Sequence, residues 1–352
     1  MDDESRIFWH NREAEPPTSA NDKTVLGASV EELSAETAKL SLRELFIKHY
    51  GPIRDWLEAH SNRRGIALLA VSPESLRAAA FVAAKSDMLS TAVVGRHSKA
   101  DLRLGDKDLS LRHVALLLFP TDATGEGCRY RLLDLRSATA FVDERGKRLR
   151  ALEADGPAFV HLGRYVLFVF VTGANVTPWP ADAEEAWRSI PDRLYLDEVE
   201  TDEKPREWEA DSDRAWEAEA LPALSQSPTL LHSKAGPEMP VHELLDEDEA
   251  AFGEMLVTSR RGAAKVLLGR GAVESGILLG RSRRCDAGRV LSERSISRVH
   301  LLIIEIAGVL YAIDTASSNG IFEHDDRERA TRLEPGSPVS LSDVARVEWQ
   351  QR

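Results

Sequence analysis

Two stretches of the chain alternate short apolar runs with turn residues. In the first stretch, apolar runs occupy residues 66–71, 81–84, 91–94, 114–119, 129–133, 160–161 and 165–170. In the second, residues 301–306 and 309–313 flank Ala307-Gly308, a pair suited to a tight turn because glycine tolerates positive φ. Short strands at even spacing are typical of antiparallel sandwiches. The pattern predicts an all-β fold with two β-sandwiches, at residues 62–172 and 254–352.

A helical pattern precedes the first sandwich, within residues 29–61. Ser41 and Glu44 have the spacing of a capping box, and apolar residues recur at helical spacing around and after them: Leu42, Leu45, Phe46 and Tyr50. We predict a short helical hairpin whose apolar face either packs on the first sandwich or serves as a docking or dimerisation element. Residues 1–28 are polar and aperiodic, which predicts a disordered tail.

Residues 173–253 differ from both sandwiches in composition. They contain eight prolines, and residues 181–260 carry 22 acidic against 7 basic side chains, a local net charge of -15 that exceeds the chain's net charge of -13. Such a composition predicts a long acidic disordered linker. Four of the chain's seven tryptophans lie in it, and we predict that they dock on a partner or on the chain's own domains: Trp179, Trp187, Trp208 and Trp216.

Three polar motifs recur in the same order in both stretches. The second stretch contains Gly280-Arg281-Ser282, then Ser297-Arg298-Val299-His300, then the segment 314–320, which reads Asp-Thr-Ala-Ser-Ser-Asn-Gly. The first contains Gly95-Arg96, then Ser110-Leu111-Arg112-His113, then the segment 134–140, at offsets of 185, 187 and 180 residues. A nearly constant offset predicts a duplicated domain, with one longer loop at residues 120–128 in the first copy.

The motifs of the second stretch resemble those of the forkhead-associated (FHA) domain, a phosphothreonine-binding β-sandwich, and the resemblance covers residues 255–352. It implies that the phosphate is held by Arg281 and Ser297, with Arg298 and Ser318 as further donors, and that Asn319 bonds the peptide backbone. The arginine supplies the charge-assisted donors that a phosphate needs. Gly280, His300 and Gly320 match family positions that hold the loops in shape, so we expect a structural role for this histidine.

The first copy departs from the FHA pattern in its third motif. Thr139 stands where Asn319 stands in the second copy, and it is too short to present both a donor and an acceptor to a peptide group. Ala138 and Ala140 replace Ser318 and Gly320. The residues Arg96, Ser110 and Arg112 could still hold an anion. We expect this degenerate copy to serve mainly as a phosphate-independent scaffold or dimer surface.

Composition and motifs exclude several other classes. The acidic balance disfavours nucleic acid and anionic membranes as partners, and no apolar run reaches the length of a membrane helix. With an acidic start and two isolated cysteines, Cys128 and Cys285, a cytoplasmic protein with free thiols is expected. No nucleophile with a base, metal-ligand cluster or phosphate-binding nucleotide loop is evident, so we expect neither an enzyme nor a cofactor.

The resemblance favours a non-enzymatic adaptor in Ser/Thr kinase signalling that binds phosphothreonine-containing proteins, such as the substrates of a kinase or the kinase itself. The alternative is a structural or assembly protein whose interactions do not depend on phosphate. Thr201 lies in an acidic stretch, Glu200-Thr201-Asp202-Glu203, which we expect to be exposed and open to phosphorylation. A phosphorylated Thr201 could fold back onto the second copy and occupy its site.

Overall fold

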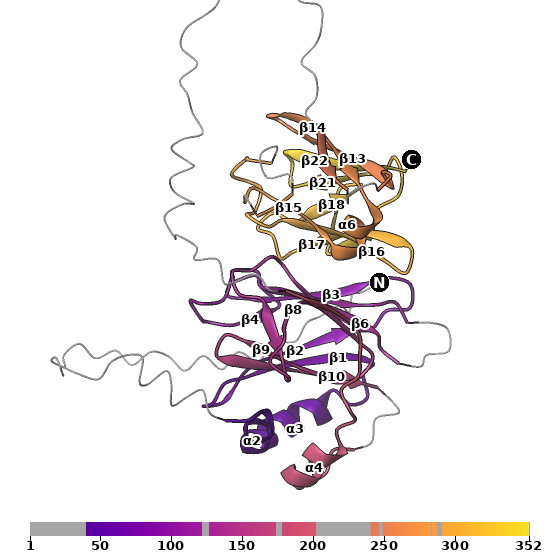
Figure 1. The fold of residues 1–352 in the computed structure, drawn as a ribbon. Coiled ribbons are helices and arrows are strands. Elements are labelled where there is room, and N and C mark those ends of the chain that lie inside the picture. Colours follow the sequence, from indigo (N-terminus) through magenta and orange to yellow (C-terminus); the bar gives the residue numbers. More distant parts are fainter. Residues whose placement is uncertain are drawn as a thin grey trace, which may run out of the picture.

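A computed structural model describes residues 40–121, 127–173, 178–201, 241–245, 249–282, 284–286 and 291–351. These residues form β-sheets with four short helices (Figure 1). Residues 40–201 make up a first domain and residues 241–351 a second domain, and the two are stacked directly on each other. The predicted tail at 1–28, the start of the helical segment, residues 202–240 of the linker, Trp208 and Trp216 lie outside the described residues.

The first domain is one continuous sheet that folds over into two layers. Its order is β2-β1-β10-β9-β7-β8-β6-β5-β3-β4, with β11 paired to β8. The strands are β1 (Gly65–Val71), β2 (Leu76–Ala83), β3 (Ser90–Gly95), β4 (Leu102–Arg103), β5 (Val114–Leu118), β6 (Tyr130–Asp134), β7 (Phe141–Asp143), β8 (Arg148–Ala154), β9 (Ala158–Leu162), β10 (Tyr165–Thr172) and β11 (Tyr195–Glu200). The helices are α2 (Leu42–Lys48), α3 (Tyr50–Ala59) and α4 (Ala183–Ser189).

The second domain has two sheets, ordered β12-β14-β13-β22-β21-β18-β19 and β15-β16-β17-β20. Its elements are β12 (Val241–Leu244), β13 (Gly253–Ser259), β14 (Gly262–Leu268), α6 (Arg270–Ser275), β15 (Ile277–Leu279), β16 (Leu301–Ile306), β17 (Val309–Asp314), β18 (Ile321–Glu323), β19 (Asp326–Glu328), β20 (Ala330–Arg332), β21 (Pro338–Leu341) and β22 (Ala345–Gln351).

The two domains repeat the same pattern of strand pairing. In the first, β1 pairs with β2 and β10, and β5 pairs with β3 and β6. In the second, β13 pairs with β14 and β22, and β16 pairs with β15 and β17. The pairs β9–β10 and β6–β8 likewise have counterparts in β21–β22 and β17–β20. All these pairs are antiparallel, so each domain presents its loops at equivalent positions.

The helical segment packs on the first domain, which was the first of the two predicted alternatives. Ser41 caps α2 with the reciprocal hydrogen bonds of a capping box to Glu44, which confirms that prediction. Phe46 of α2 is fully buried between the helices and the outer face of β1 and β10. Burying an aromatic side chain of this size contributes on the order of 2 kcal/mol.

The predicted linker begins later than its composition indicates. Residues 178–201 contain α4 and β11, and both are attached to the first domain. Trp179 and Trp187 pack against Phe46 with tilted rings, whose centroids lie 6.4 and 5.4 Å from that of Phe46. These two tryptophans therefore dock on the chain's own domain, and the expectation of disorder is wrong for this part of residues 173–253.

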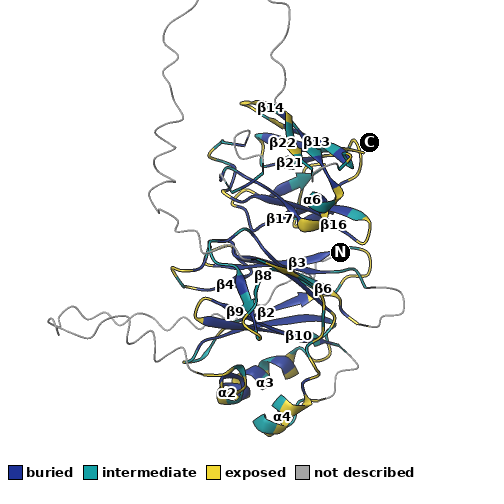
Figure 2. Ribbon diagram, viewed as in Figure 1, coloured by how far each residue is buried: buried dark blue, intermediate teal, exposed yellow. Residues whose placement is uncertain are grey.

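The two domains share a hydrophobic layer. Leu117 of β5 and Leu133 of β6 meet Leu302 and Ile304 of β16 in one buried cluster, while Leu116 and Ile303 point into the separate cores of their own domains. Strands β5 and β16 are thus buried on both faces, and Figure 2 shows buried strands on either side of the junction. This contact differs from the predicted arrangement, in which the two sandwiches are joined only through a linker.

Because of this hydrophobic layer, we expect the isolated second domain to self-associate. A fragment of residues 241–352 uncovers the apolar face of β16 and is expected to self-associate, because soluble monomers rarely expose contiguous apolar patches beyond a few hundred Å². Light scattering after size exclusion should show a mass that rises with concentration. The same fragment with Leu302→Asp is the control and should be closer to monomeric. A folded, monomeric unmodified fragment would contradict this expectation.

Candidate functional site

The first two motifs of the second domain meet through their backbones. The Arg281 amide donates to the Ser297 carbonyl at 3.1 Å, and the Ser282 amide donates to the Arg298 carbonyl at 2.9 Å. A β-carbon on Gly280 would lie 2.4 Å from the Arg298 carbonyl oxygen, closer than any side chain tolerates. Glycine at position 280 therefore lets the loop that carries Ser297 approach the end of β15.

The third motif joins them through side chains. Ser297 is buried, and its hydroxyl oxygen accepts a hydrogen bond from the Ser318 amide at 2.9 Å. The Asn319 side-chain amide donates to the Ser295 carbonyl at 2.7 Å. Ser318 and Asn319 are exposed, Arg298 is exposed, and Arg281 is half-buried. The structure thus brings together the loops that carry all five predicted phosphopeptide-binding residues.

The β17–β18 loop is held in a strained but well-supported conformation. Asp314 accepts the Ser317 amide at 2.9 Å, and the Ser317 hydroxyl accepts the Gly320 amide at 2.8 Å. Gly320 has a φ of 86°, and a β-carbon there would lie 2.6 Å from Arg327 Nε. Ala316 also adopts a positive φ, 59°. Because non-glycine residues are disfavoured there, the loop depends on its hydrogen bonds to keep this shape.

His300 contacts the second and third motifs through its two ring nitrogens. Its Nδ1 accepts the Ser297 amide at 3.1 Å, and its Nε2 lies 2.9 Å from the Gly320 carbonyl, to which it donates. These two partners fix a neutral imidazole with its proton on Nε2. Burial lowers the pKa of His300, so the ring stays neutral at pH 7 and links the second motif to the third.

The first domain repeats this architecture around its own motifs. A β-carbon on Gly95 would lie 2.4 Å from the Leu111 carbonyl, and the Arg96 amide donates to the Ser110 carbonyl at 3.2 Å. His113 accepts the Ser110 amide at Nδ1 and donates from Nε2 to the Thr139 carbonyl, at 3.2 and 2.7 Å. The structure therefore places the first-copy residues on equivalent loops, although Thr139 offers no carboxamide there.

His113 gives this architecture a pH dependence. Burial lowers the pKa of His113 to about 4, whereas the unfolded chain titrates near 6.5. Between these values the unfolded state binds more protons, so stability falls as pH falls from 6.5 towards 4. Urea unfolding should show a loss of about 2 kcal/mol from this residue between pH 7.5 and 5. His113→Gln, which can keep both hydrogen bonds, should flatten the profile, and an unchanged profile would contradict the assignment.

Arg112 lies at the junction between the two domains. Instead of facing an anion in its own domain, it is only 3% exposed and reaches into the second domain. Its Nε donates to the Thr315 carbonyl at 2.6 Å, and its Nη2 donates to the Ala316 carbonyl at 2.7 Å. Lys99, which the sequence analysis did not select, donates to the Ser318 carbonyl. The prediction that Arg112 could hold an anion in the first copy is wrong, because its guanidinium is used at the domain junction.

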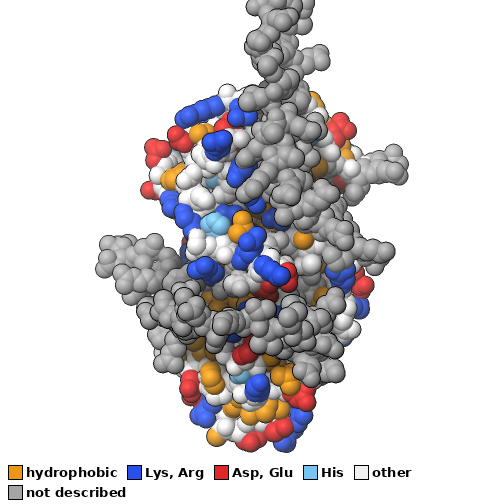
Figure 3. Space-filling view, turned by 90° about the vertical axis from the view of Figure 1, so that its left-hand side faces the viewer, with side chains coloured by type: hydrophobic (Ala, Val, Ile, Leu, Met, Phe, Trp, Pro, Cys, Tyr) orange, Lys and Arg blue, Asp and Glu red, His pale blue; other side chains and the backbone are white. Residues whose placement is uncertain are grey.

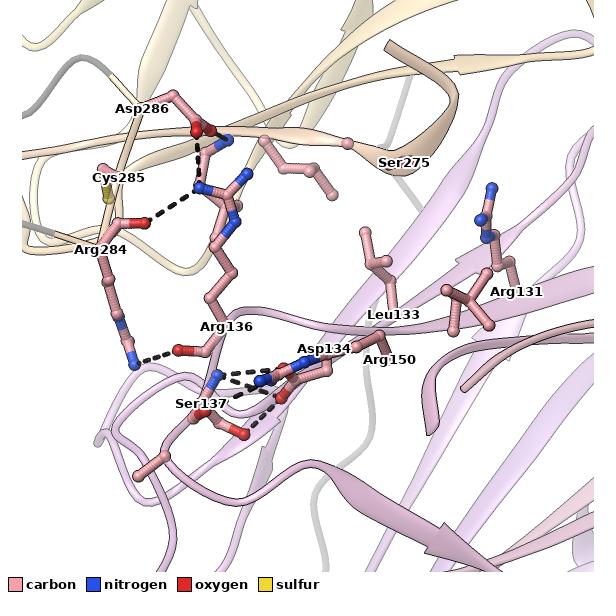
Figure 4. Close-up of a pocket in the computed structure, with 16 residues that line it drawn as sticks. Arg131, Leu133, Asp134, Arg136, Ser137, Arg150, Ser275, Arg284, Cys285 and Asp286 are labelled. Carbon is pink, nitrogen blue, oxygen red and sulfur yellow. Dashed lines mark hydrogen bonds and ion pairs between the residues drawn. The ribbon is translucent and has the colours of Figure 1, made fainter. Parts of the chain in front are cut away.

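The loop between β6 and β7 of the first domain, which corresponds to the β17–β18 loop of the second, also faces the junction. It lines a pocket of about 640 Å³ between the domains, together with β6, β8 and the segment after β15 (Figure 4). Arg136 forms an ion pair with Asp286 at 2.6 Å, and Arg284 donates to the Arg136 carbonyl at 3.1 Å. On the first domain's side of the same pocket, Arg150 forms an ion pair with Asp134. Interdomain contacts thus occupy the loop that would have to receive a peptide.

Thr201 differs from its predicted surroundings. It directly follows β11, and its amide donates to the Arg148 carbonyl at 3.0 Å, so its backbone is attached to the first domain. The side chain is of intermediate exposure. The expectation of a fully exposed linker threonine is therefore corrected, and phosphorylation at this position stays an untested prediction.

Several basic side chains on loops of both domains are exposed. Arg96 and Lys99 are exposed on the β3–β4 loop, and Arg298 and Arg327 are exposed on the second domain. Figure 3 shows lysine and arginine side chains gathered around the level of the domain junction on this face of the molecule. Within the described residues, no group of three or more potential metal ligands occurs. No helix among them is long and apolar enough to cross a membrane.

The FHA domain family model matches residues 277–349. The second domain therefore contains an FHA domain. Among solved structures, the chain is similar to the Slr1951 protein from Synechocystis (19% identity, TM-score 0.25, covering 28% of this chain and 98% of that one). It is also similar to the FHA-1 domain of Rv1747 from Mycobacterium tuberculosis (22% identity, TM-score 0.24, covering 29% and 100%).

A third similar structure is EmbR from Mycobacterium tuberculosis in complex with a low-affinity phosphopeptide (22% identity, TM-score 0.24, covering 28% of this chain and 24% of that one). With TM-scores this low, the three likenesses support no conclusion beyond the family match. No curated protein matches the chain.

Proposed function

We infer that the second domain binds phosphothreonine peptides and that the chain is a non-enzymatic adaptor in Ser/Thr kinase signalling, acting in the cytoplasm. The observation that carries this proposal is the meeting of three loops at Ser297, whose buried hydroxyl lies beneath the exposed Ser318 and Asn319. Arg298 directly follows Ser297, and the Arg281 amide donates to the Ser297 carbonyl next to the close contact between Gly280 and Arg298. A phosphate with three acceptor oxygens suits such a set of donors.

Each binding residue has a role that its position supports. Arg281 and Ser297 bind the phosphate, Arg298 and Ser318 add donors, and Asn319 bonds the peptide backbone beside the phosphothreonine. Gly280, His300 and Gly320 keep the three loops together through the contacts described above. The partners are phosphothreonine-containing proteins, either substrates of a Ser/Thr kinase or the kinase itself.

The repeated strand pairing and repeated histidine contacts support a tandem arrangement in which the first domain is a degenerate FHA copy. Its third motif lacks the carboxamide and faces the interdomain pocket. This copy therefore serves as a scaffold for the second domain.

Capture from a lysate tests the proposed function. The intact chain, immobilised, should retain proteins from an untreated lysate and lose them after phosphatase treatment of that lysate. Ser297→Ala, which removes the central hydroxyl, should abolish the same retention. Proteins retained equally from both lysates would instead support the alternative function, a phosphate-independent assembly protein. The hydrophobic layer between the domains is the observation that favours this alternative, because it shows that the sandwiches can associate without phosphate.

A further inference from the structure

The first domain contacts the peptide-binding loop of the second at two points. Arg112, which lies two positions before β5, donates hydrogen bonds to the carbonyls of Thr315 and Ala316. Lys99 holds the carbonyl of Ser318, next to Asn319. Both contacts fall on the loop between β17 and β18, which carries the exposed part of the site. The first domain therefore supports this loop in addition to the hydrogen bonds within the second domain.

Arg112 also acts on the central hydroxyl. Ser297 Oγ lies 2.9 Å from the Ser318 amide and 3.4 Å from Arg112 Nη2, and both nitrogens can only donate. A hydroxyl has two acceptor lone pairs and one proton. With both lone pairs engaged by N–H donors, the Ser297 proton is free to point away from them and to donate to a phosphate oxygen. Arg112 thus orients Ser297 as a donor.

Arg112 is a buried cation among neutral partners. Its printed hydrogen bonds within the described residues all go to uncharged oxygens: Thr315 O, Ala316 O and Ser297 Oγ. Burial lowers the pKa of Arg112 to about 10, partly opposed by nearby Asp314, so the side chain remains charged at pH 7. A buried charge is costly without an opposite charge beside it. Asp314 meets part of this cost, and a phosphate dianion bound at Ser297 would add a further opposite charge.

Lys99 adds a charge at the surface beside the same loop. It is exposed, and the β3–β4 segment 95–100 carries Arg96, His97 and Lys99 with no acidic residue. A peptide whose backbone is bonded by Asn319 passes beside Ser318, and so beside the ammonium group that donates to the Ser318 carbonyl. An acidic side chain next to the phosphothreonine would be attracted there.

We propose that the phosphopeptide site is shared between the two domains: Arg112 of the first domain positions Ser297 and the β17–β18 loop, and Lys99 favours peptides with an acidic residue beside the phosphothreonine. This inference rests on the proposed function of the second domain, and it gives the first domain a role in binding that its own altered motif does not indicate.

The test uses the intact chain and a phosphothreonine peptide selected from a random library with a fixed central phosphothreonine. Arg112→Gln, which keeps polar donors but removes the charge, should weaken binding about tenfold or more. Arg112→Lys keeps the charge and should lose less. A purely structural role would give no such order, because both variants break the planar set of hydrogen bonds.

Arg332→Ala is the matched control. Arg332 donates to the Asp87 carbonyl across the same junction at 2.7 Å, and it lies on β20 rather than on a loop of the site. This variant should bind the peptide as the unmodified chain does. If the unmodified chain binds and Arg281→Ala abolishes binding while Arg112→Gln binds normally, the shared site is excluded and the proposed function stands. If the unmodified chain binds no phosphothreonine peptide, the proposed function itself fails.

Lys99 provides an independent arm that does not depend on how Arg112→Gln folds. Lys99 is exposed, so Lys99→Glu is expected to fold normally. It should weaken binding of a peptide with an acidic residue beside the phosphothreonine about tenfold, and of the matched alanine peptide by much less. Equal losses for both peptides, or none for either, would contradict the role assigned to Lys99.

Discussion

Replacing Arg281 by alanine is expected to lower the affinity of the intact chain for a phosphothreonine peptide by about 30- to 1000-fold, which corresponds to about 2–4 kcal/mol. The residue directly follows Gly280, and its amide is fixed to the Ser297 carbonyl, so its side chain starts from a rigid point beside the central hydroxyl. Removing the guanidinium leaves a desolvated phosphate without a charged partner. Isothermal titration calorimetry measures the effect directly.

Arg346→Ala is the matched control for Arg281→Ala. Arg346 is an exposed arginine on β22, in the sheet that does not carry the first motif, and its loss changes the net charge equally. This control should retain the affinity of the unmodified chain within about twofold. An equal loss in both variants would mean that overall charge, rather than a site at Arg281, drives binding.

Leu302→Asp is expected to separate the two domains. Leu302 is fully buried in the layer shared with Leu117 and Leu133, so an aspartate there would place an unpaired charge between the domains at a cost of about 3–5 kcal/mol. Small-angle scattering should show a larger radius of gyration. Phosphopeptide affinity should fall as well, because Arg112 and Lys99 leave the β17–β18 loop.

Thr258→Asp is the control for this separation. Thr258 is exposed on β13 and lies in the other sheet of the second domain, so the same new charge should change neither the radius of gyration nor the affinity. A compact Leu302→Asp variant with unchanged melting temperature would contradict the role given to the hydrophobic layer.

The sequence predicts the site better than the contact between domains, because the site is built from local motifs. Gly280, Ser297 and Asn319 lie in segments whose order and spacing indicate the FHA pattern, and the structure brings these segments together. Arg112 and Lys99 carry no such signal. Arg112 is 203 residues from Thr315, and a basic side chain that bonds a backbone carbonyl leaves no trace in the partner's sequence.

The shared layer did have a signal in the apolar pattern. A strand with one solvated face alternates, whereas residues 301–306 are apolar at almost every position. Leu301 and Ile303 fill the core of the second domain, and Leu302 and Ile304 fill the junction. Such a run indicates that both faces are covered, but it does not identify the surface that covers them.

For the predicted linker, the acidic composition indicated disorder, but residues 178–201 are ordered and contain α4 and β11. The acidic side chains of β11 are not merely solvated: Glu198 pairs with Arg145, and Glu200 pairs with Lys147 at 2.6 Å. Charge counts over 80 residues average out such local pairing. Residues 178–201 therefore belong to the first domain, although their composition resembles that of a disordered chain.

The central claim is that the second domain recognises phosphothreonine, and calorimetry on the intact chain tests it most directly. One selected peptide is compared in three forms, with phosphothreonine, with unmodified threonine and with phosphoserine. We predict micromolar affinity for the phosphothreonine form, roughly -7 to -9 kcal/mol, and no measurable binding of the unmodified form. The phosphoserine form should bind more weakly than the phosphothreonine form. Equal affinity for the phosphorylated and unmodified peptides would contradict the claim.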